Sequence, residues 1–89
     1  MEHYQFRITG KVQGVFFRQT SKEKADEFGV KGFARNEPDG SVYIEAEGAP
    51  EALEKFGKWC ETGPENARVE QVKTTPGKPK GYTTFEVKR

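Results

Sequence analysis

The stretch that decides the fold is residues 4–18, YQFRITGKVQGVFFR. Its first half alternates apolar and polar residues, and this period of two predicts a strand with one buried face formed by Tyr4, Phe6, Ile8 and Val12. Gly10 and Gly14 then bracket a turn. The next positions are spaced by four, four and three residues, which predicts one face of a helix formed by Phe17, Ser21, Ala25 and Phe28. Gly29 is a natural C-terminal stop for that helix.

A hairpin is predicted after the first helix. In the first strand, Gly32, Ala34 and Asn36 share one face. In the second strand, Val42, Ile44 and Ala46 share one face. Between them lies Pro38-Asp39-Gly40, in which proline presets its φ and glycine accepts a left-handed conformation, so the segment favours a tight turn.

A second helix and two further strands complete the pattern. Pro50 suits the first turn of a helix that buries Leu53, Phe56 and Cys60 and ends at Gly63-Pro64. Another strand runs through Val69 and Val72, whose spacing of three breaks the alternation and indicates a bulge. Residues 74–82 are predicted to be an exposed loop, and Phe85 and Val87 a short last strand.

The predicted order is β-α-β-β-α-β with a short additional C-terminal strand. This order predicts an α+β, ferredoxin-like, two-layer sandwich, in which two helices cover one face of a mostly antiparallel sheet. We expect one domain over residues 1–89, with no repeats and no linker. The other sheet face is expected to be solvated, with Phe33 and Tyr43 pairing across the hairpin.

Composition narrows the function classes. The chain has 15 basic and 14 acidic residues, which argues against general affinity for nucleic acid or membranes. No apolar run approaches the roughly 20 residues that cross a bilayer. Cys60 is the single cysteine, which fits a reducing compartment, so a cytoplasmic location is predicted; we interpret this residue as part of the core. His3 is expected to be a mobile terminal residue without a role.

The glycine turn also has the features of an oxyanion site. Glycines at 10 and 14 let the backbone approach a ligand closely, so that successive N–H groups can converge at the start of the following helix. Arg18 adds a planar fork that matches phosphate or carboxylate. Asn36 ends the second strand; if the first strand and strand 41–48 are neighbours, its amide faces the loop at 13–18 and can hold a water molecule.

Three motifs resemble those of the acylphosphatase family. Gly10–Arg18 is similar to its first signature, and GFARN at 32–36 followed by GSV at 40–42 is similar to its second. A further stretch common in that family resembles GPENARV at 63–69. The resemblance covers essentially the whole chain and includes the predicted order of elements.

This resemblance implies hydrolysis of the mixed anhydride of acyl phosphates to a carboxylate and inorganic phosphate. The matching motif positions imply that Arg18 and Asn36 are the catalytic residues and that Asn36 orients the attacking water. The phosphate is bound by the Arg18 guanidinium and by the backbone amides of Gln13, Gly14, Val15, Phe16, Phe17 and Arg18. Neither a metal nor a cofactor is implied, inorganic phosphate is expected to inhibit competitively, and a monomer is expected.

Besides a phosphate-binding regulator with incidental hydrolysis, two alternatives stay open at this point. One is an acyl phosphate- or carbamoyl phosphate-binding module that acts with a larger enzyme, because acylphosphatase-like domains occur within hydrogenase maturation proteins. The other, more remote, is an RNA-recognition module, since Lys31–Ala34 resembles the start of its RNP1 motif. That match fails at Arg35 and Asn36 and lies on the second strand, whereas the stacking motif belongs on the third.

Overall fold

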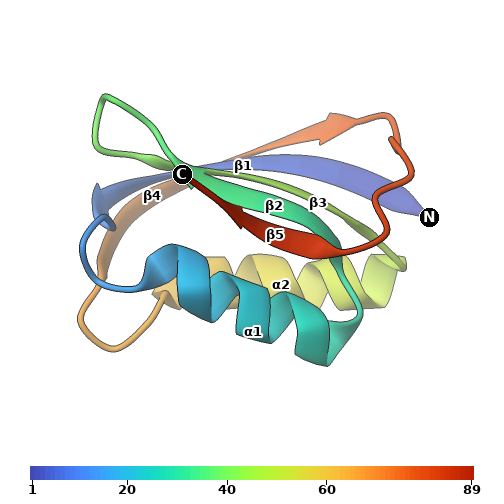
Figure 1. Cartoon of the computed structure of the whole chain (residues 1–89), viewed down its shortest axis with the longest axis horizontal. Coiled ribbons are helices and arrows are strands. Elements are labelled where there is room, and N and C mark those ends of the chain that lie inside the picture. The colour runs from blue at the N-terminus through green and yellow to red at the C-terminus, as the bar shows by residue number, and fades with distance from the viewer.

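The computed structural model describes all of residues 1–89, and Figure 1 shows its two layers. The elements are β1 (Glu2–Lys11), α1 (Phe17–Phe28), β2 (Lys31–Asn36), β3 (Val42–Gly48), α2 (Pro50–Thr62), β4 (Arg68–Gly77) and β5 (Phe85–Lys88). The predicted order, including the short last strand, is confirmed. Gly29 ends α1 in a left-handed conformation, as its position predicted.

The five strands form one sheet in the order β4-β1-β3-β2-β5. Three of the neighbouring pairs are antiparallel, and only β2 and β5 run parallel. Both helices pack on the same face, as Figure 1 shows. The ferredoxin-like sandwich predicted from the sequence is therefore confirmed, and the pairing of β1 with β3 meets the condition under which Asn36 faces the loop after β1.

The core lies between the helices and the covered face of the sheet. Phe56 of α2 stands at its centre, with its ring 5.9 Å from that of Phe6 and 5.8 Å from that of Phe85. Cys60 is completely buried beside it, and burial raises the pKa of its thiol, so it is a core residue as predicted. The other fully buried apolar side chains include Ile8, Ala25, Ala34, Val42 and Ile44.

The predicted bulge lies in β4 and controls how β1 ends. Thr9 pairs with Gln71 and Gly10 with Val69, so one residue of β4, Glu70, has no partner in β1. Gly10 has a φ of 121°, and a Cβ there would lie 2.1 Å from the carbonyl oxygen of Arg68. Only glycine fits this crossing, which adds local twist just before the chain leaves the sheet for the loop.

The prediction for the C-terminal part of the chain was wrong in one respect. Residues 74–77 are not loop but the end of β4, which pairs with β1 as far as His3. The connection that follows crosses the open face of the sheet, where Tyr82 packs 6.0 Å from Phe33. Phe33 is only 5% exposed and Glu45 6%, so this face is less solvated than expected. The Phe33–Tyr43 contact is confirmed, at 6.0 Å.

His3 is not a mobile terminal residue. It is 2% exposed, and its Nδ1 lies 2.8 Å from Glu47 Oε2. The Glu47 carboxylate also accepts hydrogen bonds from the backbone N–H groups of Lys80, Gly81 and Tyr82. Burial by itself would raise the pKa of Glu47, but these donors outweigh it and lower the pKa. A buried carboxylate thus fixes the connection that leads to β5.

No helix of this structure has the length and apolar character needed to span a membrane.

Candidate active site

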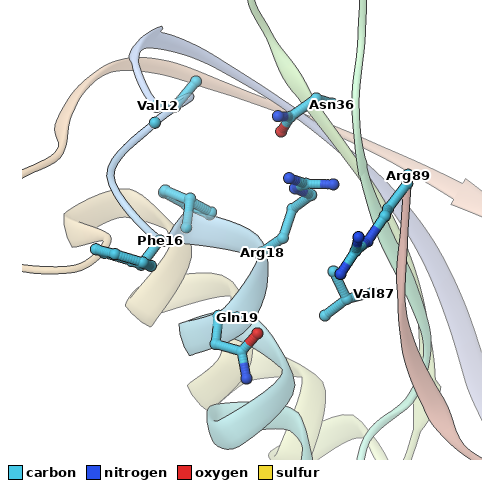
Figure 2. Close-up of a pocket in the computed structure, with 9 residues that line it drawn as sticks. Val12, Phe16, Arg18, Gln19, Asn36, Val87 and Arg89 are labelled. Atoms are coloured by element: carbon cyan, nitrogen blue, oxygen red, sulfur yellow. The ribbon is translucent and has the colours of Figure 1, made fainter.

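A pocket of about 570 Å³ opens where the β1–α1 loop, the start of α1, the end of β2 and the end of β5 meet. Figure 2 shows its side chains. It is lined by Val12, Gly14, Phe16, Phe17, Arg18, Gln19, Asn36, Val87 and Arg89. Two of these residues are arginines and none is acidic, so the pocket is suited to an anion.

The backbone of the β1–α1 loop presents free donors. None of the N–H groups of Gln13, Gly14, Val15 and Phe16 donates to a backbone carbonyl. Gly14 has a φ of 74° and Phe16 a φ of 63°, and Phe16 is the only residue other than glycine with a positive φ. Left-handed backbone of this kind at the start of a helix turns successive N–H groups toward one side, which is how proteins build anion cradles.

The side chains of the loop point in different directions. Val15 and Phe17 are buried, and Phe17 packs with its ring 5.3 Å from that of Trp59. Phe16 is 77% exposed at the rim of the pocket. The loop is therefore anchored in the core on both sides of Phe16, which keeps its backbone in place without a ligand.

The N-terminus of α1 has neither a capping side chain nor an acidic residue in its first turn. Its first N–H groups lack intrahelical partners, and the helix dipole adds partial positive charge there. A basic residue in this turn is unfavourable by dipole sign, yet Arg18 occupies it. Both features disfavour the isolated helix and favour a bound anion.

Arg18 and Asn36 meet across this pocket. Figure 2 shows the guanidinium and the carboxamide pointing toward one another, from α1 and from the end of β2. The sheet brings them together because Ile8 of β1 and Asn36 of β2 both pair with Val42 of β3. Residues that are 18 positions apart in sequence thus face the same cavity. Both side chains are half-buried.

Comparison of the sequence with models of protein families identifies the relatives of this chain. The family model described as Acylphosphatase matches residues 4–87. The chain belongs to the acylphosphatase family. An acylphosphatase of a Nocardioides species is 47% identical over 81 residues, which cover 91% of this chain and 82% of that protein.

Solved structures agree with this acylphosphatase assignment. The crystal structure of an acylphosphatase from Bacillus subtilis superposes with a TM-score of 0.97 at 31% identity and covers both chains completely. Full-length HypF in its phosphate- and nucleotide-bound form matches 99% of this chain with a TM-score of 0.88 at 25% identity, but the match covers only 12% of HypF.

Four lining residues of this acylphosphatase were not predicted from the sequence as site residues, and one of them, Val12, was predicted only as part of the buried face of the first strand. Gln19 follows Arg18 directly, and its place beside the signature was the one available signal. Val87 and Arg89 come from the end of the chain, where β5 pairs in parallel with β2. A four-residue edge strand gives no sequence signal for its neighbour, so their approach to Arg18 was not predictable. Gln13, in contrast, does not line the pocket with its side chain.

Proposed function

We propose that this acylphosphatase cleaves the carboxyl–phosphate anhydride of small acyl phosphates by direct attack of water on phosphorus. The Arg18 guanidinium and the N–H groups of residues 13–18 hold the phosphate, and the Asn36 carboxamide holds the water. The observation that supports this best is the meeting of Arg18 and Asn36 in one pocket beside loop amides that have no backbone acceptor.

Binding of the phosphate follows from the donors that the pocket offers. A guanidinium carries five N–H donors in a fixed fork. One of those of Arg18 donates a hydrogen bond to the carbonyl oxygen of Lys88 at 2.7 Å. The remaining donors and the loop amides match the oxygens of a phosphoryl group. The charge that spreads over these oxygens in the transition state is stabilised by the same groups, which are already in place before the reaction.

The attacking water needs a partner that both donates and accepts hydrogen bonds. The Asn36 carboxamide does both and carries no charge, so it does not repel a dianionic substrate. The water oxygen forms a bond to phosphorus while the bond from phosphorus to the acyl oxygen breaks. The water proton passes to a phosphate oxygen, and the acyl group leaves as a carboxylate, which is a stable anion and needs no general acid.

The finer properties of the reaction follow from this arrangement. Inorganic phosphate is a product that fits the same cradle, so it acts as a competitive inhibitor. We further propose that the enzyme works as a monomer in the cytoplasm, without a cofactor and without nucleic acid as a partner. The near balance of 15 basic and 14 acidic residues argues against nucleic acid as a partner, and the single buried cysteine fits the cytoplasm.

A direct assay tests the proposed reaction. Purified protein is incubated with benzoyl phosphate, and the release of benzoate and inorganic phosphate is measured with and without a chelator. We expect equal amounts of both products, rates unchanged by the chelator, and competitive inhibition by inorganic phosphate. Absence of turnover would overturn the hydrolase mechanism, and loss of turnover on chelation would overturn its independence of metals.

The similarity to part of HypF favours a second candidate. In that case this chain binds an acyl phosphate or carbamoyl phosphate and acts with a larger enzyme, and the support is the match of 99% of this chain at a TM-score of 0.88. The same assay separates the two candidates. A binding module retains affinity for inorganic phosphate, measured by calorimetry, but shows no turnover of benzoyl phosphate or carbamoyl phosphate.

A further inference from the structure

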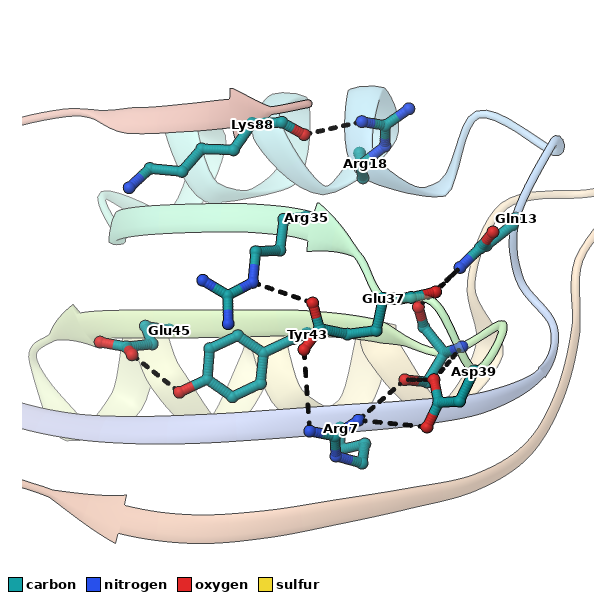
Figure 3. A network of polar contacts seen from close by, with 10 residues as sticks. Arg7, Gln13, Arg18, Arg35, Glu37, Asp39, Tyr43, Glu45 and Lys88 are labelled. Carbon is teal, nitrogen blue, oxygen red and sulfur yellow. Dashed lines mark hydrogen bonds and ion pairs between the residues drawn. The ribbon is translucent and has the colours of Figure 1, made fainter.

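The side chain of Gln13 does not line the pocket and joins the β1–α1 loop to the β2–β3 turn. Its Nε2 donates one hydrogen bond to the carbonyl oxygen of Glu37 at 2.8 Å and another to that of Ser41 at 2.9 Å. Figure 3 shows the side chain reaching from the loop after β1 to the turn that connects β2 and β3. Both N–H donors of this carboxamide are therefore used on one turn.

These two carbonyls are the points at which the turn closes on itself. Glu37 N–H donates to the Ser41 carbonyl at 2.8 Å, and Gly40 N–H donates to the Glu37 carbonyl at 3.1 Å. A carbonyl oxygen accepts two hydrogen bonds, so Gln13 fills the second position on each. The turn and the phosphate-binding loop thus share a single hydrogen-bonded unit, although 24 and 28 positions separate the bonded residues.

The turn begins directly after Asn36. Because Glu37 follows Asn36 directly at the end of β2, we expect a shift of Glu37 relative to the loop to move the Asn36 carboxamide relative to the loop amides. A second tie comes from Arg7, which donates to Ser41 Oγ at 3.0 Å and to Asp39 Oδ2 at 3.4 Å. Arg7 Nη2 also lies 3.9 Å from Glu37 Oε1, and Arg35 Nε donates to Glu37 Oε2 at 3.0 Å, so ion pairs hold the side next to Asn36 as well. The Arg7 and Arg35 side chains are 43% and 44% exposed, so water competes for these contacts, whereas the hydrogen bonds from Gln13 go to the backbone of the turn.

We propose that Gln13 is a positioning residue whose carboxamide fixes Asn36, and with it the attacking water, relative to the bound phosphate. This inference rests on the proposed function and extends it to a side chain that touches neither substrate nor water. It predicts a separation of two effects. Loss of the carboxamide misplaces the water, but the phosphate remains bound by Arg18 and the backbone amides.

Gln13→Met tests this role because methionine has a similar length and lacks the two donors. We expect kcat for benzoyl phosphate to fall about tenfold to a hundredfold, as expected when a reacting group is misplaced by about 1 Å. We expect the inhibition constant of inorganic phosphate to stay within about twofold of the wild-type value, because Arg18 and the backbone amides still bind the phosphate. Gln71→Met, at an exposed position of β4, is the matched control and leaves both constants unchanged.

A second readout does not depend on turnover. The backbone and side-chain amide resonances of Asn36 are compared between wild type and Gln13→Met by NMR, with inorganic phosphate bound. We expect both to shift in Gln13→Met and neither in Gln71→Met. Gln13→Asn retains the amide but reaches one carbonyl at most, so its kcat lies between those of wild type and Gln13→Met.

The outcomes separate this inference from the proposed function. If kcat and the Asn36 resonances of Gln13→Met match the wild type, the positioning role is wrong. A parallel loss of kcat and phosphate affinity also overturns it, because Gln13 then serves the phosphate cradle itself. If wild type and Gln71→Met both fail to hydrolyse benzoyl phosphate, the proposed function fails, and the resonances of Asn36 alone decide the role of Gln13. If Gln13→Met does not fold, Gln13→Asn is measured in the same way, and wild-type values there overturn the inference.

Discussion

Arg18 Nη1 donates a hydrogen bond of 2.7 Å to the main-chain carbonyl of Lys88. The acceptor belongs to β5, and Lys88 pairs there with Arg35, the neighbour of Asn36. The register of β5 on β2 thus places the Lys88 carbonyl, which holds the Arg18 guanidinium, close to Asn36. Because a long side chain loses rotamer freedom when it binds a ligand, holding Arg18 in advance lowers the entropic cost of binding phosphate.

A chain shortened to end at Val87 lacks this acceptor. Hydrogen bonds to charged groups contribute about 1.5–3 kcal/mol, so kcat/KM for benzoyl phosphate is expected to fall about tenfold to a hundredfold. The affinity for inorganic phosphate falls with it. Arg89→Ala in the full-length chain is the control, because the Lys88 carbonyl remains a neutral amide that accepts from Arg18. Equal losses in the shortened chain and in Arg89→Ala would assign the effect to Arg89 instead.

Arg18→Gln removes the charge and most of the fork at the centre of the pocket. An arginine that stabilises a phosphoryl transition state contributes about 10³–10⁵ in rate, so turnover falls to the background of the assay. Phosphate affinity is lost too, which calorimetry measures. Arg18→Lys restores the charge without the planar fork and is expected to recover only part of the affinity. Retention of phosphate binding by Arg18→Gln would show that the loop amides suffice.

Asn36→Ala is expected to separate binding from chemistry. The variant loses the carboxamide that we propose holds the water, so turnover of benzoyl phosphate falls to background, while the inhibition constant of inorganic phosphate stays much nearer the wild-type value. Asn36→Asp is the informative partner because its carboxylate repels the dianion and weakens phosphate binding as well. If Asn36→Ala kept most of the activity, the water-holding role would be wrong.

The two glycines of the signature are expected to respond differently to alanine. At Gly10 a Cβ would lie 2.1 Å from the Arg68 carbonyl, and the backbone of β4 cannot move away, so Gly10→Ala destabilises by more than about 3 kcal/mol. At Gly14 no atom lies within 4 Å of the added Cβ, and only the φ of 74° is unfavourable. Gly14→Ala is therefore expected to lower the free energy of unfolding by about 1–2 kcal/mol. Urea denaturation measures both, and similar losses would contradict this difference.

Glu45 makes the stability of the protein dependent on pH. Burial would raise its pKa, but hydrogen bonds from Lys80, Tyr43 and Tyr82 outweigh it and lower the pKa to about 2. A carboxyl with a lowered pKa stabilises the fold above its ordinary pKa, and this contribution disappears as the pH falls from about 4.5 toward 2.

Glu45→Gln isolates that contribution. At pH 7 the variant is expected to be less stable than the wild type by about 2 kcal/mol, because charged hydrogen bonds become neutral ones. The difference between the two free energies of unfolding, measured in urea, narrows as the pH is lowered below 4.5. A difference that is constant between pH 7 and pH 2.5 would show that the charge of Glu45 does not contribute.

The parts of the fold that depend on local pattern were predictable. Alternation over Tyr4–Ile8, helical spacing over Phe17–Phe28 and the turn at Pro38–Gly40 each reflect a constraint that acts within a few residues. The spacing of Val69 and Val72 even indicated the bulge in β4. The failures at His3 and at residues 74–77 have one physical cause. His3 is held by Glu47, and residues 74–77 are held in β4 by pairing with residues 3–6 of β1, so in both cases the partner is distant in sequence.

The sequence by itself determined the order of the elements, the glycine-bracketed turn after β1, and the presence of Arg18 at the start of a helix. Only the tertiary structure decided that Asn36 faces Arg18, that Lys88 accepts its hydrogen bond, and that Gln13 holds the β2–β3 turn. The physical reason is that chemistry between groups separated by tens of residues depends on strand order and register, which follow from packing of the whole sheet rather than from any one segment.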